Sequence, residues 1–377
     1  MNILVLGAGL VGAAIVEDLA VDFDVTCLDI NQENLDKIKD NKKITKINAD
    51  VLKDNIVNML LDEADVVVNA TPGFMGFQVL KKIIEAGKNC VDIAFFSEDP
   101  FELDELARSN GVTAIVDCGV APGMSNILTG YVYYQMERTD EAVTYVGGLP
   151  KVREWPWEYK AVFSPIDVIE EYTRPARYIR DGKMIVMPAL SEPELMNFPG
   201  VGTIEAFNTD GLRTMAQTLN IPNMKEKTLR YPGHIEKMRI MRETGLFSTE
   251  PVEIKGVEVR PIDLTAKLLF PQWELKENET DITVMRVEVT GLKDGKKYRY
   301  IYDLIDEKDD ETGVHSMART TGYTATAAVR LLAEGLFGAK GIIAPEFLGK
   351  NKDNVKFLLK ELKKRNIEYV ETIEEIE

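Results

Sequence analysis

The chain has 377 residues, of which 45% are hydrophobic and 28% are charged, and its formal net charge at pH 7 is −17. This length and composition are typical of a soluble globular protein with two domains, or with one domain and a large insertion. The acidic balance argues against nucleic acid as a partner, and no apolar run approaches the ~18 residues of a membrane span.

The N-terminal segment and the cysteines bear on the cellular compartment. The first residues, MNILVLGAGL, contain neither a basic region nor a small-residue cleavage site, so we expect no signal peptide. Cys27, Cys90 and Cys118 are odd in number, widely spaced and set in apolar stretches. These features are typical of reduced core cysteines in a cytoplasmic protein. No ligand spacing such as CxxC or HExxH occurs, and we therefore expect no bound metal.

A glycine-rich turn follows the first predicted strand. The apolar run NILVL is followed by GAGLVG, which places Gly7, Gly9 and Gly12 before a helical pattern. Strand, glycine turn and helix are the setting that the GxGxxG fingerprint of dinucleotide-binding domains requires. In this interpretation Gly7 permits the turn, Gly9 leaves room for the pyrophosphate, and Gly12 lets the helix pack closely. Leu10 and Val11 then stand at the helix N-terminus, which faces the phosphates.

The second predicted strand, DVTCLDI, ends at Asp29, 22 residues after Gly7. A carboxylate at this position accepts hydrogen bonds from the adenosine ribose hydroxyls and repels a 2′-phosphate. The next residues, Ile30, Asn31 and Gln32, provide no arginine to bind such a phosphate. The sequence therefore favours NAD over NADP, and we expect both Asp29 and Ile30 to contact the cofactor.

Four more apolar strands alternate with helical patterns up to about residue 122: ITKINAD, ADVVVNATP, NCVDIAF and VTAIVDCGVAPGMSN. This rhythm predicts an α/β fold with a doubly wound parallel sheet of the Rossmann type, in which ligands lie at the carboxyl ends of the strands. The alternative for each strand-end loop is that it serves only as a connection. The strand-end residues expected to contact the cofactor are Asp50, Val51, Asn69, Ala70, Thr71, Pro72, Asp92, Ala121 and Pro122.

The pattern changes over residues 123–319. Two hairpins, RYIRDGKMIVM and ITVMRVEVTGLKDGKKYRYIYDL, are predicted to turn at their Asp-Gly pairs, and Ser164 is predicted to cap a helix. Such hairpins indicate a second α/β domain with a mixed, largely antiparallel sheet. We expect this domain to carry substrate specificity and the dimer contact. An Ala-rich helix from about residue 320 is expected to return the chain to the first domain, which would then consist of residues 1–122 and about 320–377.

Seven blocks stand out in chain order: DCGVAPGMSN, YVGGLP, EEYTRPARYIRDGK, EAFNTDGLRT, TLRYPGH, MARTTGYTA and GIIAPEFLG. Over essentially the full length, these blocks resemble the saccharopine dehydrogenase-like family, and most closely its branch of NAD-dependent L-lysine 6-dehydrogenases. The resemblance implies a Rossmann domain paired with an α/β substrate domain, and a homodimer. It also implies oxidation of a primary amine carbon of an amino acid by hydride transfer to NAD.

For the reaction, the resemblance implies oxidative deamination of the ε-amine of L-lysine to the semialdehyde, which cyclises. A related dehydrogenase acting on saccharopine or on a polyamine such as homospermidine or carboxynorspermidine is an alternative. A second alternative, from a different class, is a non-catalytic NAD-binding regulatory protein, because a fold alone does not decide function.

Several residues are candidates for substrate binding. Arg213 is expected to form a bidentate pair with the α-carboxylate of the substrate. Arg174, Tyr172 and the backbone at Gly148 are further candidates, and Phe95 is a candidate for an apolar sleeve around the substrate stem. The alternatives are a structural salt bridge for each arginine, a plain turn for the glycine, and core packing for the aromatic residues.

Three residues are candidates for the general base that deprotonates the amine. His234, in YPGHIEKM, is predicted to lie in the first turn of a helix, where the helix dipole favours the neutral imidazole. Its alternative is a structural histidine. Lys160 is a candidate as a neutral, desolvated amine, with a solvated lysine as the alternative, and Asp92 is a candidate with a turn cap as the alternative. The other histidine, His315, is expected at the surface.

Overall fold

The computed structural model describes residues 1–162, 165–276 and 278–377, and the predicted helix cap at Ser164 lies outside them. The chain forms two compact units. The first contains Met1–Gln135 and Ala318–Glu368, and the second contains Met136–Met317 and Tyr369–Glu377. The division therefore falls after Gln135 instead of near residue 122, and the C-terminal residues belong to the second unit, whereas we expected them in the first.

Within the described residues, the sheet of the first unit has seven strands, all paired in parallel. In spatial order they are β17 (Gly341–Ile343), β6 (Thr113–Ile115), β5 (Asn89–Asp92), β4 (Val66–Asn69), β1 (Asn2–Leu6), β2 (Asp24–Asp29) and β3 (Ile44–Asn48). The strand order reverses beside β1, as it does in doubly wound folds. The predicted α/β class with a parallel sheet is confirmed. The sequence reading missed β17, because its three residues are too few to give a strand pattern.

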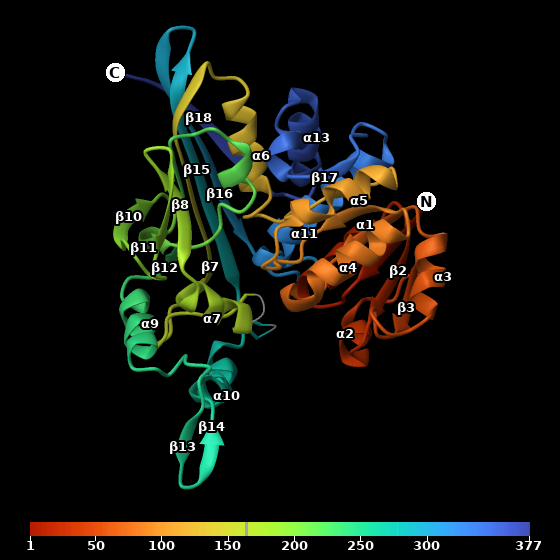
Figure 1. Cartoon of the computed structure of the whole chain (residues 1–377), viewed down its shortest axis with the longest axis horizontal. Coiled ribbons are helices and arrows are strands. Elements are labelled where there is room, and N and C mark those ends of the chain that lie inside the picture. Colours follow the sequence, from red (N-terminus) through yellow and green to blue (C-terminus); the bar gives the residue numbers. More distant parts are fainter. Residues whose placement is uncertain (163–164, 277) are drawn as a thin grey trace. The chain divides into compact units, whose positions relative to one another are not determined.

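Helices of the first unit pack against this sheet, with α1 against β1 and β2, and α4 against β4 and β5 (Figure 1). Most of these strands are apolar runs because they are buried, whereas β3 at the edge is only partly buried, and the buried strand side chains form one core with those of α3 and α4. The helices, in chain order, are α1 (Leu10–Leu19), α2 (Gln32–Lys37), α3 (Ile56–Glu63), α4 (Gly73–Glu85), the 3₁₀ helix η1 (Pro100–Leu103), α5 (Asp104–Ser109), α6 (Met124–Tyr133), α11 (Ser316–Ala333, which enters the unit at Ala318), α12 (Pro345–Leu348) and α13 (Lys352–Lys363).

The register of the strands brings their carboxyl ends to one level. Leu6 pairs with Leu28 on one side and with Asn69 on the other, and Asn69 pairs with Asp92. The loops that follow β1, β2, β4 and β5 therefore emerge together at one edge of the sheet. This is the edge at which ligands bind in open α/β sheets.

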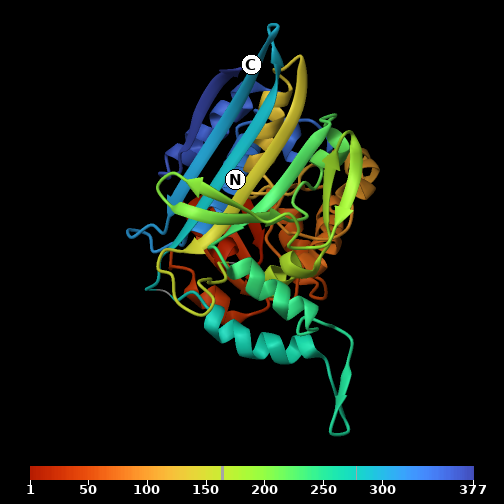
Figure 2. The same cartoon turned by 90° about the vertical axis from the view of Figure 1, so that its left-hand side faces the viewer.

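The second unit is built on a mixed sheet, in which β12 pairs with β7 in parallel and the other described pairings are antiparallel. Figure 2 shows its long strands β7, β15 and β16 running side by side. The strands are, along the main path, β10 (Glu194–Phe198), β11 (Gly202–Asn208), β12 (Asn223–Arg230), β7 (Arg138–Pro150), β15 (Asp281–Lys293), β16 (Lys296–Glu307) and β18 (Tyr369–Ile376). Off this path, β8 (Ala176–Arg180) pairs with β12, and β9 (Lys183–Met187) pairs with β8. The C-terminal residues belong to this unit because β18 pairs with β16.

Both predicted hairpins are present. The β8–β9 turn is made by Asp181 and Gly182, with φ of 50° and 72°, and the β15–β16 turn by Asp294 and Gly295, with φ of 51° and 74°. Two successive residues in the left-handed region are what a tight turn between right-twisted strands requires, and Asp-Gly supplies them at low cost.

Helices and a small hairpin complete the second unit. Three of the helices share a core with Tyr159 and Tyr172, and the hairpin extends away from the rest of the unit (Figure 2). These elements are α7 (Pro165–Thr173), α8 (Met215–Thr218), α9 (His234–Glu243), α10 (Pro261–Trp273) and the hairpin of β13 (Val252–Ile254) and β14 (Val257–Val259).

The start of α11 corrects the expectation for His315. The buried carboxylate of Asp281 accepts hydrogen bonds from the amides of Ser316 and Met317, at 2.8 and 3.0 Å, and so caps the helix. Nδ1 of His315 lies 3.1 Å from the same carboxylate, and its side chain is mostly covered. A surface position for His315 is therefore wrong, because the residue is part of this cap.

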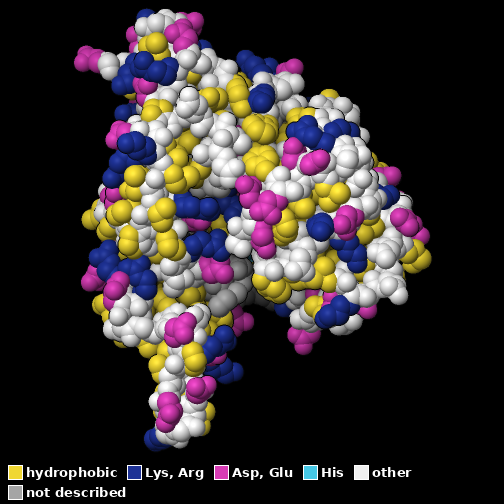
Figure 3. All heavy atoms as spheres, viewed as in Figure 1, with side chains coloured by type: hydrophobic (Ala, Val, Ile, Leu, Met, Phe, Trp, Pro, Cys, Tyr) yellow, Lys and Arg dark blue, Asp and Glu magenta, His cyan; other side chains and the backbone are white. Residues whose placement is uncertain are grey.

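Acidic and basic side chains are interspersed over the face drawn in Figure 3, although the chain as a whole is strongly acidic. Across the described residues, none of the helices combines the length and the apolar character that crossing a membrane would demand.

Candidate functional site

The glycine turn after β1 is fixed by backbone contacts that leave no room for side chains. Gly7 has φ of 104°, and a Cβ atom there would overlap the carbonyl oxygen of Ala70. A Cβ atom on Gly12 would overlap the carbonyl of Gly7. Both positions therefore require glycine, and the first turn of α1 is held directly against the ends of β1 and β4.

Gly9 differs from its two neighbours in the motif. A Cβ atom at Gly9 would have no described protein atom within 4 Å, so the protein's own packing does not require glycine here. Gly9 is the N-cap of α1, and no side chain caps this helix end among the described contacts. The free amides of the first turn are therefore available to an anion, and the open space beside Gly9 fits a phosphate group.

Asp29 is held at the end of β2 by backbone amides. Its carboxylate accepts hydrogen bonds from the amide of Ala8 at 2.6 Å and from the amide of Asn31 at 2.7 Å. Each oxygen keeps a lone pair for a ribose hydroxyl, since a carboxylate has about four acceptor positions. Ile30 is exposed beside it. The structure thus joins the glycine turn and the expected ribose-binding carboxylate by one hydrogen bond.

The ends of β4 and β5 are linked by a buried polar cluster. Nδ2 of Asn69 donates to Asp92 at 2.5 Å and to the carbonyl of Gly76 at 3.1 Å, and Oδ1 of Asn69 accepts from the hydroxyl of Thr71 at 2.7 Å. The carboxylate of Asp92 also accepts from the amide of Ala94. Because the side chain of Asp92 is fully buried in these contacts, the turn-cap alternative describes it better than the role of a general base.

The other expected cofactor residues differ in how accessible they are. Leu10 and Pro72 are exposed, and Val11, Asp50, Ala70, Ala121 and Pro122 are partly buried. Asp50 forms an ion pair with Lys53 at 3.0 Å. Val51 is buried in the hydrophobic core of the unit, so its side chain is not available to a ligand in this arrangement.

In the second unit, a chain of hydrogen bonds runs through buried side chains. Nη2 of Arg230 donates to Glu171 at 2.5 Å, and Nε of Arg230 donates to the hydroxyl of Tyr172 at 3.2 Å. That hydroxyl lies 3.0 Å from Nε2 of His234, and Nδ1 of His234 lies 3.0 Å from the carbonyl of Trp157. Arg230, Tyr172 and His234 are 2%, 0% and 1% exposed. The guanidinium of Arg230 also lies over the ring of Tyr159, with 4.7 Å between Cζ and the ring centroid.

The carbonyl of Trp157 determines which atoms donate in this series of hydrogen bonds. A carbonyl only accepts hydrogen bonds, so Nδ1 of His234 carries the proton and Nε2 accepts from the hydroxyl of Tyr172. Burial and the nearby Arg230 cation lower the pKa of His234 to about 3. Its helical position is as predicted, because α9 begins at His234. However, an imidazole with this pKa and with both nitrogens occupied is a poor proton acceptor at neutral pH, and the structural alternative describes it better.

The remaining candidates of the second unit are mostly engaged in structural contacts. Nζ of Lys160 is 3.2 Å from Glu279 and donates to the carbonyl of Glu274 at 3.2 Å, which are the contacts of a charged ammonium. Arg174 pairs with Glu170. A Cβ atom on Gly148 would meet side chains of Val162 and Met317, so this glycine makes room for packing within the unit.

The side chains of Arg213 and Phe95 are at least partly exposed to solvent. Arg213 is half-buried, in the loop between β11 and α8, with φ of 50°. A non-glycine residue in this region is uncommon and is often found at functional positions. Phe95 is exposed, in the loop after β5 of the first unit.

Sequence reasoning did not find Arg230, Glu171 or Glu226, three ionisable residues of the second unit whose contacts are largely buried. Arg230 lies at the end of β12 inside the block TLRYPGH, four residues before the histidine that was singled out. A charged residue inside an otherwise buried strand is unusual, because burying a charge is costly without a partner. A charged residue at this place in the sequence could therefore have indicated a buried ion pair.

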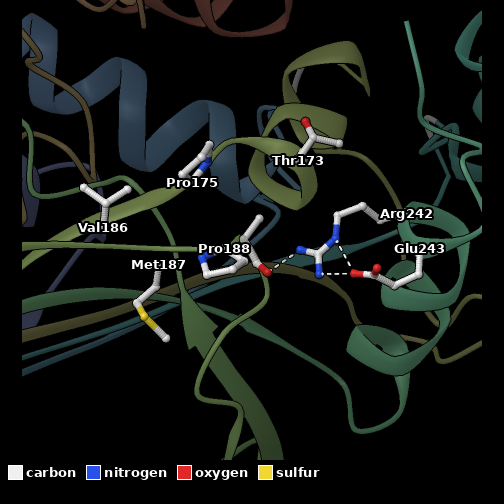
Figure 4. Close-up of a pocket in the computed structure, with 8 residues that line it drawn as sticks. Thr173, Pro175, Val186, Met187, Pro188, Arg242 and Glu243 are labelled. Atoms are coloured by element: carbon white, nitrogen blue, oxygen red, sulfur yellow. Dashed lines mark hydrogen bonds and ion pairs between the residues drawn. The ribbon is translucent and has the colours of Figure 1, made fainter. Parts of the chain in front are cut away.

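A pocket of about 390 Å³ lies elsewhere in the second unit. Figure 4 shows Arg242 beside this pocket, hydrogen-bonded to Glu243, and Met187 on its apolar side. The described residues that line it are Thr173, Pro175, Val186, Met187, Pro188, Ala189, Arg242 and Glu243. Since the predicted site residues are not among them, we do not assign the catalytic function to this pocket.

Family models match nearly the whole chain. The model of the saccharopine dehydrogenase NADP binding domain matches residues 3–115, and that of the saccharopine dehydrogenase C-terminal domain matches residues 119–367. The chain belongs to the saccharopine dehydrogenase family. The resemblance inferred from the seven sequence blocks is thereby confirmed at the level of the family.

Individual relatives are distant. The chain is 22% identical over 369 residues to carboxyaminopropylagmatine dehydrogenase from Synechocystis sp., with 92% of each chain covered. It is 23% identical over 426 residues to mitochondrial alpha-aminoadipic semialdehyde synthase from Mus musculus, where the match covers 91% of this chain and 45% of that protein. The fold matches that of apo saccharopine dehydrogenase (L-Glu forming) from Saccharomyces cerevisiae, with a TM-score of 0.82, 19% identity and 99% of each chain covered.

Membership of the saccharopine dehydrogenase family makes the protein an NAD(P)-dependent dehydrogenase that acts on a CH–NH donor. This sets aside the alternative of a non-catalytic regulatory protein. The choice between NAD and NADP, and the identity of the amine, depend on the site itself.

The geometry of the glycine turn gives a test that separates binding from folding. We expect Gly9→Ala to leave the melting temperature unchanged, because its Cβ atom meets no described protein atom, and to weaken dinucleotide binding by at least about tenfold, because it fills the phosphate space. Calorimetric titration and thermal unfolding measure the two effects. Gly338→Ala, also in open space in the first unit, is the matched control and should change neither. Equal dinucleotide affinity in Gly9→Ala and the unmodified protein would contradict the assignment.

Proposed function

We propose that this protein is an NAD-dependent amine dehydrogenase that oxidises the ε-amine carbon of L-lysine, releasing ammonia and giving the semialdehyde, which cyclises. The observation that carries the proposal of a dinucleotide-dependent reaction is the carboxylate of Asp29, fixed by the amides of Ala8 and Asn31 at the edge that the glycine turn defines. The seven sequence blocks support the lysine branch of the family.

The cofactor proposal rests on electrostatics at the end of β2. A 2′-phosphate would have to approach the fixed carboxylate of Asp29, and the following residues Ile30, Asn31 and Gln32 contain no cation. NAD has no phosphate at this position and can donate its ribose hydroxyls to the carboxylate. We therefore propose NAD, although the matching family model is described as an NADP binding domain.

The charges of the second unit support a substrate with a carboxylate over a polyamine. Glu171 is paired with Arg230, and Asp210 is paired with Arg177 through two contacts of 2.8 Å. Burial raises the pKa of Glu226 to about 8, so that it is largely protonated at neutral pH. Glu171 and Asp210 thus each have an arginine as counter-charge, and Glu226 has a proton. These three carboxyl groups together therefore offer no excess negative charge to bind a polycation.

A polyamine-type dehydrogenase remains the second candidate. The relative from Synechocystis is named carboxyaminopropylagmatine dehydrogenase, and it matches 92% of this chain. That name describes an amine that carries both a carboxyl group and a cationic arm, so a carboxylate anchor would suit it as well.

The proposed reaction begins with the free amine. Its nitrogen needs a lone pair before hydride can leave C6, and NAD bound at the glycine turn and Asp29 would supply the acceptor for this hydride. The amine carbon is thereby oxidised to an iminium. Water adds to it, and ammonia then leaves the carbinolamine with release of one proton, which gives the semialdehyde. Arg213 is proposed to anchor the α-carboxylate. His234 is proposed as a positioning residue that holds the Tyr172 hydroxyl, and through it Arg230, because neither of its nitrogens is free to take the proton.

We also propose that the protein is a homodimer, as the resemblance to the family implies. A cytoplasmic location is proposed because the three cysteines are buried and form no disulfide.

The cofactor proposal predicts the effect of a double substitution. Asp29→Ser with Ile30→Arg should shift the preference from NAD toward NADP by roughly tenfold or more, because it removes the repelling carboxylate and adds a cation for the phosphate. The ratio of kcat/KM for the two cofactors measures the shift. Asp24→Ser, at the start of the same strand, combined with Val21→Arg, in the turn before it, controls for the change in charge. An unmodified protein that uses NADP as well as NAD would contradict the role of Asp29.

The anchoring role of Arg213 is tested with a substrate that lacks the carboxylate. Arg213→Ala should cost about 2–5 kcal/mol of transition-state binding with L-lysine, and much less with 1,5-diaminopentane. Arg138→Ala, which removes an exposed arginine paired with Asp140, is the matched control. Losses of the same size for both amines would show that Arg213 acts on the fold and not on the carboxylate.

The proposed role of His234 predicts the pH profile. With no histidine acting as base, kcat/KM should rise about tenfold per pH unit from about pH 6 to pH 8, because the free-amine fraction rises in this way below an amine pKa of about 10.4. His234→Gln should keep this slope, and so should His315→Gln, the matched variant of the other histidine. A plateau above about pH 7 that disappears only in His234→Gln would restore His234 as the general base.

A further inference from the structure

The acidic residue Glu226 is buried directly beneath the loop that carries Arg213. Glu226 lies on β12 and is almost completely shielded from solvent. The amide of Thr209 donates to the backbone carbonyl of Glu226 at 3.2 Å. A Cβ atom on Gly211 would overlap the Glu226 carboxyl group. The loop backbone from Thr209 to Gly211 therefore rests on this side chain, two residues before Arg213.

The Glu226 carboxyl group is joined to the loop by hydroxyl hydrogen bonds. Its Oε2 is hydrogen-bonded to the hydroxyl of Thr209, which lies 2.9 Å from the hydroxyl of Thr228. The amide of Gly211 also donates to the carboxyl group. When Glu226 is protonated, it can donate to Thr209, which then donates to Thr228. When it is ionised, Thr209 must turn its proton toward the carboxylate.

The charged surroundings oppose ionisation. Glu171, from α7, and Asp210, in the loop itself, both act on Glu226 as negative charges. These two acids have arginine partners of their own, since Arg230 pairs with Glu171 and Arg177 pairs with Asp210. On the opposite face of β12, Lys225 and Lys227 pair with Glu192 and Glu194, respectively. Burial, together with Glu171 and Asp210, raises the pKa of Glu226 to about 8, against hydrogen bonds from Thr209 and Gly211 that lower it.

We propose that Glu226 is a positioning residue which, in its protonated form, clamps the Thr209–Arg213 loop onto β12 and so holds Arg213 in place for the substrate carboxylate. The second part of this inference rests on the anchoring role proposed for Arg213. Ionisation releases the clamp, because the new buried carboxylate repels Asp210 in the loop and draws in water. The protein then binds carboxylate substrates more weakly in mildly alkaline solution.

The first test measures the loop without any substrate. Amide hydrogen exchange of residues 209–213 is followed in the unmodified protein and in Glu226→Gln between about pH 6.5 and pH 9. At each pH the exchange rate of the unmodified protein is divided by that of Glu226→Gln, which removes the base catalysis common to both. The ratio should be near one at the lower pH and rise to roughly tenfold at the upper pH, one unit above the pKa of the carboxyl group. Glu253→Gln, on the exposed β13, is the matched control and should follow the unmodified protein.

A ratio that stays flat over this range would overturn the inference. Thr209→Val provides a second variant in case Glu226→Gln is poorly folded. It removes the hydroxyl link, so its loop should already exchange faster than the unmodified loop at about pH 6.5. Exchange equal to that of the unmodified protein at this pH would also overturn the clamp.

The second test uses the substrate. Between about pH 7 and pH 9, KM for L-lysine should rise in the unmodified protein relative to Glu226→Gln, by about the same factor as the exchange ratio, and KM for 1,5-diaminopentane should not. If the exchange ratio rises but KM changes equally with pH for both amines, the clamp is supported and the anchoring role of Arg213 is contradicted. The two tests therefore distinguish failure of this inference from failure of the proposed function.

Discussion

Contact between backbone atoms of the glycine turn and the end of β4 sets the geometry of the first unit. Neither Gly7 nor Gly12 has space for a Cβ atom, because the carbonyls of Ala70 and of Gly7 itself occupy it. This close approach aims the amides of α1 at the edge of the sheet, and the amide of Ala8 from the same turn holds the carboxylate of Asp29. The proposed sites for the phosphates and for the ribose therefore both depend on this turn, which only glycine permits.

The second unit depends on a different constraint, which is that a buried charge needs a counter-charge or a proton. Arg230 has Glu171, and Glu226 keeps its proton. Tyr172 and His234 extend the Arg230 network to the backbone, and burial with the Arg230 cation keeps His234 neutral. The same low-polarity surroundings that make His234 unsuitable as a base at neutral pH make Glu226 responsive near pH 8. One unit thus contains a histidine that does not titrate near neutrality and a carboxyl group that does.

Features set by local chemistry could be predicted from the sequence. The glycine turn, the carboxylate of Asp29 and both Asp-Gly hairpins follow from short segments whose backbone requirements are specific. Contacts between distant segments could not be predicted. The backbone at Gly148 was expected to approach the substrate, but the space beside it is taken by Val162 and Met317. The partners of His234 come from α7, from β12 and from the loop at Trp157, and no spacing in the sequence indicates that these segments meet.

The most direct test of the account follows hydrogen from substrate to cofactor. L-lysine carrying deuterium at C6 is incubated with the protein and NAD, and the reduced cofactor and the ammonia released are both measured. We expect deuterium on the reduced nicotinamide and one ammonia for each reduced cofactor, with little reaction when NADP replaces NAD. Reduction of the cofactor by saccharopine or by a polyamine, with no reaction of L-lysine, would contradict it.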